Sequence, residues 1–181
     1  MLAGLDTNVL IDFRLLGMAP ILARVLEGEG WTTVFVDREF EDPLGETEGR
    51  VGRVFPFLEI DPVDARLLPR IERDQIAIMG RQRAAAGAAG GEASLVHVAL
   101  TNRSGSIILS NDSHAAGLGR RYDLSVRGTL YVIHRAFVAG LISSMEVWKN
   151  HEELTRLGRR PPALARPQLD SYLRTGQDPR R

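Results

Sequence analysis

Three acidic residues occupy positions from which their carboxylates could act together. Asp6 and Asp112 each follow a short apolar run, and Glu92 opens a helix-like stretch between them in the chain. In an open α/β sheet, ligands collect at the carboxyl ends of the strands. Carboxylate oxygens at that edge suit Mg²⁺ or Mn²⁺. The three acids therefore indicate metal-assisted phosphoryl chemistry.

The hydrophobic pattern predicts the elements that must position these acids. Apolar and β-branched runs predict strands over 2–5, 32–36, 55–60, 107–109 and 124–126. Three- and four-residue spacing predicts helices over 7–16, 20–26, 61–71, 92–100, 113–122, 129–141 and 143–157. Alternating strands and helices predict an α/β protein with a central, mainly parallel sheet covered by helices on both faces.

Composition and charge suit one domain followed by a basic tail. The chain has 181 residues, zero net charge and no cysteine, which excludes disulfides and thiolate metal sites. Residues 1–157 are expected to form the domain. Residues 158–181 are expected to form a proline-containing tail with a short helix over 168–173. Residues 156–181 contain seven arginines and two aspartates, so the tail suits a phosphate-bearing partner, although a solvated basic tail is the other interpretation.

Membrane and export signals are not visible in the sequence. No apolar run reaches the roughly 18 residues of a membrane span, and the first residues lack a basic segment followed by an apolar one. We therefore expect a cytoplasmic protein with no membrane partner.

The tail is expected to pack loosely and to contact RNA or a protein partner.

Five motifs occur in a fixed order around the acids. They are Leu-Asp-Thr-Asn-Val-Leu-Ile at 5–11, Gly-Glu-Ala at 91–93 before an apolar helix, Ile-Leu-Ser-Asn-Asp at 108–112, Leu-Ser-Val-Arg-Gly-Thr-Leu at 124–130 and Gly-Leu-Ile at 140–142. In this order they resemble the PIN-domain nuclease family over most of residues 1–157. The last two are similar to one bacterial branch of that family.

The resemblance implies a fold, an activity and a set of partners. It implies a three-layer PIN-like fold and an acidic pocket holding Mg²⁺ or Mn²⁺. It implies a metal-dependent endoribonuclease that cleaves single-stranded RNA, often as the VapC-like toxin of a toxin–antitoxin pair. Asp6, Glu92 and Asp112 would then be the catalytic, metal-holding acids, because a divalent ion relieves the repulsion among close carboxylates. A cognate antitoxin is the expected protein partner, and a homodimer is left open.

The chain departs from the family pattern at His114, where many members carry a fourth acid. Histidine can ligate Mn²⁺ but supplies no negative charge. The alternative hypothesis is therefore a catalytically weak PIN-like protein that acts by binding RNA or a protein partner. A haloacid-dehalogenase-like phosphatase is disfavoured, because it needs a second aspartate where Asn8 stands.

Several residues near the acids are expected to position the carboxylates or to contact the RNA. Asn8 is expected to orient Asp6 by a hydrogen bond, and Asn111 to support the site from a turn or cap. Arg120 and Arg121 are candidate contacts to RNA phosphates at the rim of the pocket, with a solvated helix face as the alternative.

Three further polar residues receive structural interpretations. Asp12 is expected to be solvated on the first helix. Asp37 is expected to follow a strand directly, with a cap or turn role. His97 lies off the face that carries Glu92 and is expected to be structural.

Overall fold

The computed structural model describes residues 1–41, 43–44, 50–79, 90–159 and 164–177. Its centre is a five-stranded sheet in the order β3-β2-β1-β4-β5, and every neighbouring pair is parallel. The strands are β1 (Ala3–Leu5), β2 (Gly30–Thr33), β3 (Glu59–Asp61), β4 (Ile107–Leu109) and β5 (Val126–Arg127).

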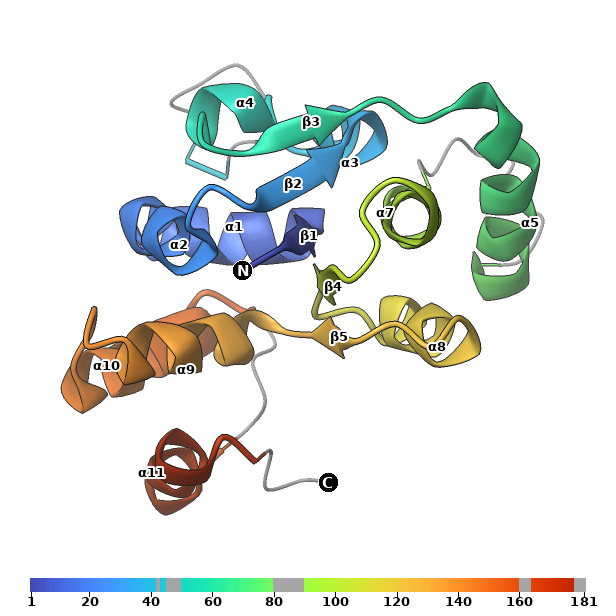
Figure 1. The fold of residues 1–181 in the computed structure, drawn as a ribbon. Helices are drawn as coiled ribbons and strands as arrows, with labels where there is room; N and C mark the ends of the chain where they lie inside the picture. Colours follow the sequence, from blue (N-terminus) through green and yellow to red (C-terminus); the bar gives the residue numbers. More distant parts are fainter. Residues whose placement is uncertain (42, 45–49, 80–89, 160–163, 178–181) are drawn as a thin grey trace.

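Helices cover both faces of the sheet, which confirms the predicted α/β class and its three layers. On one side lie α5 (Leu68–Met79), α7 (Gly91–Thr101) and α8 (Ser113–Arg121) (Figure 1). On the other side lie α1 (Thr7–Leu15), α2 (Ala19–Leu26), α9 (Thr129–Val138) and α10 (Ser144–Arg156). Shorter elements near β2 and β3 are α3 (Val34–Glu39), α4 (Val51–Val54) and the 3₁₀ turn η1 (Ala65–Leu67), and the last helix is α11 (Arg166–Thr175).

The order of the strands creates a switch point between β1 and β4. From β1 the chain builds β2 and then β3 toward one edge, and it then returns to build β4 and β5 on the other side of β1. The loops that leave β1 and β4 therefore turn in opposite directions and open a crevice at their carboxyl ends. Asp6 follows β1 directly, and its N–H donates to the carbonyl of Leu109 at 3.0 Å, so the two strand ends are joined.

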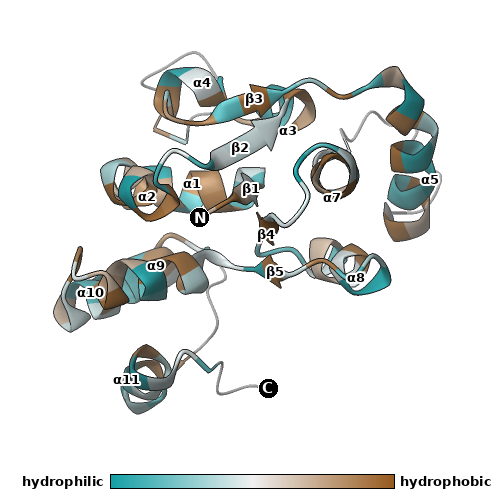
Figure 2. Cartoon of the chain, viewed as in Figure 1, coloured by the Kyte–Doolittle hydropathy of each residue, from teal (hydrophilic) through white to brown (hydrophobic). Residues whose placement is uncertain are grey.

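The core is dense around α7 and the central strands. Eight residues of α7 are buried, so this helix is covered on nearly all sides. Figure 2 shows hydrophobic residues on α7 and on β4 in the middle of the molecule. Trp31 is fully buried beside β1, where a Cβ on Gly4 would lie 2.6 Å from its Cζ2 atom. Glycine at that position therefore allows the indole to lie against the sheet.

Two predicted strands were wrong over more than half of their length. Only residues 59 and 60 of the strand predicted over 55–60 lie in β3, and only residues 32 and 33 of the strand predicted over 32–36 lie in β2. Residues 34–36 belong to α3 instead of a strand, and Thr33 ends β2 and caps that helix by accepting the N–H of Val36 at 3.4 Å. Asp37 therefore lies within α3 and does not end a strand. Its Oδ1 accepts the N–H of Val51 at 2.9 Å where α4 begins. A capping hydroxyl overrode the β propensity of Val34 and Val36.

The C-terminal segment packs more tightly than expected. Helix α11 extends beyond the predicted 168–173 and contacts α9 and α10. Four apolar side chains of the segment are buried in the hydrophobic core: Leu164, Leu169, Tyr172 and Leu173. The Tyr172 ring also lies 5.1 Å from the ring of His134 on α9, measured between centroids. The segment thus adds buried surface to the domain instead of lying loosely on it.

Candidate active site

Asp6 is a buried carboxylate at the switch point. Only 2% of the residue is exposed, and it caps α1 by accepting the N–H of Thr7 on Oδ1 at 2.8 Å. Its Oδ2 accepts the Asn8 side-chain amide at 2.7 Å and the Ser110 hydroxyl at 2.6 Å. Burial, together with the charge of Glu92, raises the pKa of Asp6 to about 7, although the hydrogen bonds from Ser110 and Thr7 act to lower it.

Glu39 is a fourth carboxylate at this site, and no sequence motif indicated it. It ends α3 and accepts the N–H of Gly91 on Oε1 at 3.1 Å and the Thr7 hydroxyl on Oε2 at 3.3 Å. Burial, together with the charges of Glu92 and Asp6, raises its pKa to about 7. The Thr33 cap was the available signal, because it predicts a helix beginning after Thr33, and Glu39 lies on that helix.

Glu92 lies in the first turn of α7, which Ser94 holds against the end of β2. The hydroxyls of Ser94 and Thr33 are 2.7 Å apart, and the Ser94 hydroxyl also lies 2.7 Å from the Gly91 carbonyl. Burial raises the pKa of Glu92, and the charge of Asp112 raises it further. The acid on α7 is therefore electrostatically coupled to the acid that follows β4.

Asp112 caps α8 and has His114 beside it. Its side chain accepts the His114 N–H at 2.5 Å, and His114 Nδ1 lies 3.2 Å from Asp112 Oδ1. The Asp112 N–H donates to the Ser110 hydroxyl at 3.1 Å, and that hydroxyl donates to Asp6. Ser110 thus connects two of the acids. The side chain of His114 is 46% exposed, so it lies at the open side of the site.

Four carboxylates from four elements therefore interact at one edge of the sheet. They are Asp6, Glu39, Glu92 and Asp112, and the pKa is raised for the first three. The N-termini of α1, α7 and α8 lie at the same edge and partly offset the negative charge. An excess of close carboxylates remains, which is the usual electrostatic condition for binding a cation.

The donor chemistry fits a hard divalent cation, because every acid offers carboxylate oxygen. The four carboxylates, however, lie farther apart than the ligands of one metal ion. Within the described part of the chain, no group of three or more His, Asp or Glu side chains is arranged so that it could hold a metal ion as it stands. Rotation of the side chains toward one another would be needed to form a coordination shell.

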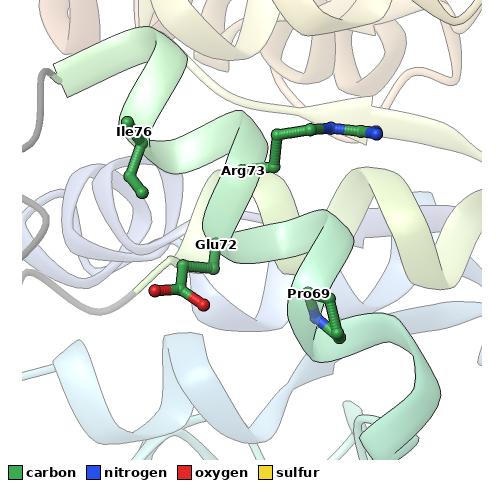
Figure 3. Close-up of a pocket in the computed structure, with 4 residues that line it drawn as sticks. All are labelled: Pro69, Glu72, Arg73 and Ile76. Atoms are coloured by element: carbon green, nitrogen blue, oxygen red, sulfur yellow. The ribbon is translucent and has the colours of Figure 1, made fainter.

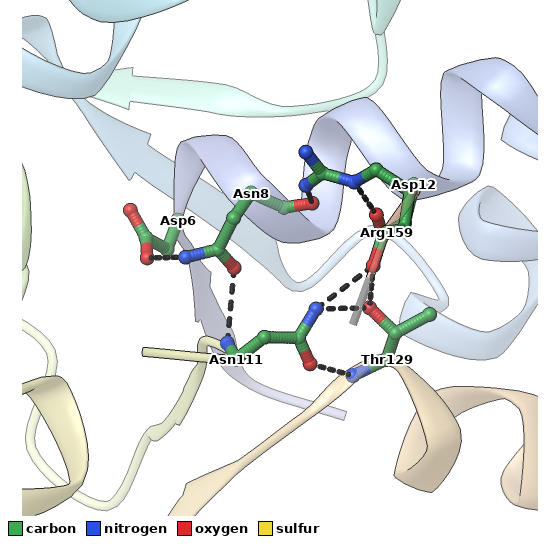
Figure 4. Close-up of polar contacts among 6 residues, drawn as sticks. All are labelled: Asp6, Asn8, Asp12, Asn111, Thr129 and Arg159. Carbon is green, nitrogen blue, oxygen red and sulfur yellow. Dashed lines mark hydrogen bonds and ion pairs between the residues drawn. The ribbon is translucent and has the colours of Figure 1, made fainter. Parts of the chain in front are cut away.

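A second polar cluster lies directly beside Asp6 (Figure 4). Its centre is Asp12, which is 3% exposed, so the expectation of a solvated residue was wrong. Asp12 Oδ2 accepts the side-chain amide of Asn111 at 2.8 Å and the hydroxyl of Thr129 at 2.7 Å, and its Oδ1 lies 2.6 Å from Nε of Arg159. Pairing with partners distant in sequence explains why Asp12 is buried.

The cluster reaches Asp6 through Asn8. The side-chain oxygen of Asn8 accepts the N–H of Asn111 at 2.9 Å, while its amide donates to Asp6. Asn111 also accepts the N–H of Thr129 on Oδ1 at 2.9 Å. The two asparagines thus bridge the carboxyl ends of β1, β4 and β5. Gly128 is required beside them, because a Cβ there would lie 2.5 Å from Asn111 Oδ1.

The basic residues expected at the rim lie at the far end of α8. Asp112 begins that helix and Arg121 ends it. Arg121 donates to Asp74 of α5 at 3.2 Å, and Arg120 is exposed beside it. Asp74 also pairs with His97 of α7, whose Nε2 lies 2.9 Å from Oδ2. His97 is buried in this contact and has the structural role that we expected.

An open depression on α5 is separate from the acids (Figure 3). It has a volume of about 320 Å³ and is lined by Pro69, Glu72, Arg73 and Ile76. None of these residues contributes to the carboxylate cluster, and the four lining residues include a single carboxylate, that of Glu72. We therefore assign the candidate site from the carboxylates and not from this depression.

Comparisons with known proteins identify no relative from which a function could be inferred. Neither the protein-family models, nor the curated proteins, nor the solved structures give a match to this chain. Across the described residues, no helix has both the length and the apolar character to cross a membrane. The features of this chain that bear on its function are therefore the sheet topology and the four carboxylates.

Proposed function

We propose that this chain is a divalent-metal-dependent endoribonuclease that cleaves phosphodiester bonds of single-stranded RNA. The observation that carries the proposal is the set of four interacting carboxylates at the switch point, with raised pKa values for three of them. Carboxylates that raise one another's pKa at a strand edge are a frequent sign of a functional site. The motif order around Asp6, Glu92 and Asp112 supports a nuclease of the PIN type.

In this proposal the four carboxylates would hold Mg²⁺ or Mn²⁺. When bound, the ion would supply activation of water and stabilisation of charge on the phosphoryl group. The residues around the acids would orient the carboxylates toward the ion. Asn8 and Ser110 donate hydrogen bonds to Oδ2 of Asp6, and the Ser110 hydroxyl also accepts the N–H of Asp112. Ser110 therefore fixes the position of Asp6 relative to Asp112. Thr7 and Gly91 orient Glu39 in the same way.

The decisive experiment is a cleavage assay with single-stranded RNA, double-stranded RNA and single-stranded DNA. We expect cleavage of single-stranded RNA with Mg²⁺ or Mn²⁺ and none with EDTA. Asp112→Asn should abolish cleavage, which separates the protein's activity from a contaminating ribonuclease. Asp64→Asn is the matched control, because Asp64 is an acid that also caps a helical turn, and it pairs with Arg66. Full activity of Asp112→Asn would refute the proposal.

A catalytically weak RNA-binding or partner-binding protein is the second candidate. The observation that favours it is His114, which places an imidazole 3.2 Å from Asp112 where a further carboxylate would strengthen metal binding. This candidate predicts RNA binding in a filter assay without turnover. Recovery of cleavage by His114→Asp would show that His114 limits the site.

The biological setting that we propose is the toxin half of a toxin–antitoxin pair. Expression of the chain in bacteria should then stop growth, and Asp6→Asn should remove the effect. If bacteria continue to grow with the unaltered chain although it cleaves RNA in vitro, the proposal of a nuclease stands and the proposal of a toxin is rejected. The expected protein partner is a cognate antitoxin that covers the acids. A homodimer is tested by sedimentation.

A further inference from the structure

Arg159, three residues after the end of α10, reaches the candidate active site. Gly158 has φ of +71°, and the next N–H, that of Arg159, donates to the Leu154 carbonyl at 2.9 Å. This left-handed turn ends the helix and brings the side chain of Arg159 against α1. The guanidinium of Arg159 then lies between Asp12 and the backbone of Asn8 (Figure 4).

Arg159 makes two different contacts with its planar head group. Its Nε lies 2.6 Å from Asp12 Oδ1, and its NH2 group donates to the Asn8 carbonyl at 3.0 Å. The Asp12 side chain is 4% exposed, and that of Arg159 is 28% exposed. A carboxylate this deeply buried needs a cation or several donors to remain charged. Arg159 is the cation within reach of it among the described residues.

The contacts of Asn8 connect this ion pair to the acid at the switch point. Asn8 is held through its carbonyl by Arg159 and through its side-chain oxygen by the N–H of Asn111. Its side-chain amide is then directed at Asp6 Oδ2. Asn111 is held in turn by Asp12, and Asn111 directly precedes Asp112. Two acids are therefore oriented by residues that the ion pair keeps in place.

We propose that Arg159 is a positioning residue that couples the C-terminal segment to the active site: by neutralising Asp12 and holding Asn8, it orients Asp6 and the loop before Asp112. This inference rests on the proposed role of Asp6 and adds a regulator of its geometry. Displacement of the segment that follows α10 would release Asn8 and disorder the site without touching an acid.

The geometry also explains why arginine is needed. One guanidinium reaches two acceptors in different directions, whereas a lysine ammonium is a single point charge on a flexible stem. Arg159→Lys should keep the charge beside Asp12 but lose the contact to the Asn8 carbonyl. Arg159→Met should lose both, while keeping similar length. Arg156→Met is the matched control, because Arg156 lies three residues earlier and pairs with exposed Glu153 outside the cluster.

The test uses the full chain and two independent measurements. The first is hydrogen exchange of the Asn8 side-chain amide, followed by NMR in the metal-free protein. The second is Mn²⁺ affinity by isothermal titration calorimetry. We expect Arg159→Met to accelerate the amide exchange and to weaken Mn²⁺ binding about 10-fold, the usual effect of losing an outer-shell contact. Arg159→Lys should lie between Arg159→Met and the parent, and Arg156→Met should match the parent.

Each outcome supports or overturns the inference. A lower melting temperature in Arg159→Met, with unchanged Asn8 exchange and unchanged Mn²⁺ affinity, would make Arg159 a structural anchor only. If the parent binds no Mn²⁺, the proposed metal-dependent function fails, but the Asn8 exchange still decides whether Arg159 holds that residue. If Arg159→Met does not fold, the comparison of Arg159→Lys with Arg156→Met gives the answer.

Discussion

The carboxylate of Glu39 accepts a hydrogen bond from the backbone N–H of Gly91 at 3.1 Å, across 52 residues of chain. This contact joins the end of α3 to the beginning of α7, the helix that carries Glu92. It also leaves no room for a side chain at Gly91, where a Cβ would lie 2.5 Å from Glu39 Oε2. The glycine therefore permits two acids on different helices to approach each other.

Gly91→Ala should displace Glu39 while leaving the fold intact. The added Cβ meets the flexible end of a glutamate and not backbone, so the structural adjustment is small. We expect the melting temperature to change by no more than a few degrees, and Mn²⁺ affinity by calorimetry to fall about 10-fold. Gly117→Ala is the control, because its Cβ would meet only Arg120 at 3.9 Å. Unchanged affinity in Gly91→Ala would remove Glu39 from the proposed metal site.

Glu39→Gln should stabilise the metal-free protein at high pH. The folded state raises the pKa of Glu39 from 4.5 to about 7, so folding loses stability as the pH rises through this interval, where the unfolded chain is already ionised. Glutamine can accept from Gly91 and donate to Thr7, and it carries no charge. After allowance for solvent screening, we expect a gain of about 1 kcal/mol at pH 8.

This gain should shrink to near zero at pH 4.5, where Glu39 is protonated in the folded state and partly protonated in the unfolded chain. Urea unfolding in EDTA at the two pH values measures the difference. Glu72→Gln on the exposed surface of α5 is the control and should show no such pH dependence. An equal effect of Glu39→Gln at both pH values would mean that neither burial of the charged Glu39 carboxylate nor its repulsion by the other acids governs the effect of this residue on stability.

His114→Asp should strengthen Mg²⁺ binding. The imidazole lies 3.2 Å from Asp112 and near enough to Glu92 to lower its pKa, so a carboxylate at this position would add negative charge to the cluster. We expect a rise in Mg²⁺ affinity of about 3- to 10-fold by calorimetry at pH 8, and a lower melting temperature without metal. An unchanged affinity would show that position 114 lies outside the metal site.

Truncation after Gly158 should destabilise the domain strongly. It removes Arg159, the cation beside buried Asp12, together with four buried apolar side chains from the core. Each of those side chains contributes about 1.5–3 kcal/mol when fully buried, so we expect a loss of at least several kcal/mol in urea unfolding or a failure to fold. Truncation after Gln177 is the control. A melting temperature within a few degrees of the parent would restore the prediction of a loosely packed tail.

Local sequence patterns were sufficient for the general plan of the fold. Short apolar runs and helical spacing predicted the parallel sheet with helices on both faces, and β1, β4 and α8 lie close to their predicted residues. Asp6 and Asp112 were predicted at strand ends because each acid follows its own hydrophobic run within three residues. These features depend on neighbours within a few residues, which is the range over which periodicity and capping act.

Only the tertiary structure brought Glu39 and Arg159 to the site. The β-branched residues before Glu39 favoured a strand, and the fold placed them in α3, where the last residue meets α7. Asp12 and Arg159 are 147 residues apart, and neither has a local pattern that distinguishes a buried ion pair from two solvated charges. The environment of a side chain is created by packing between distant segments, so its burial and its partners follow from the complete fold and not from local spacing.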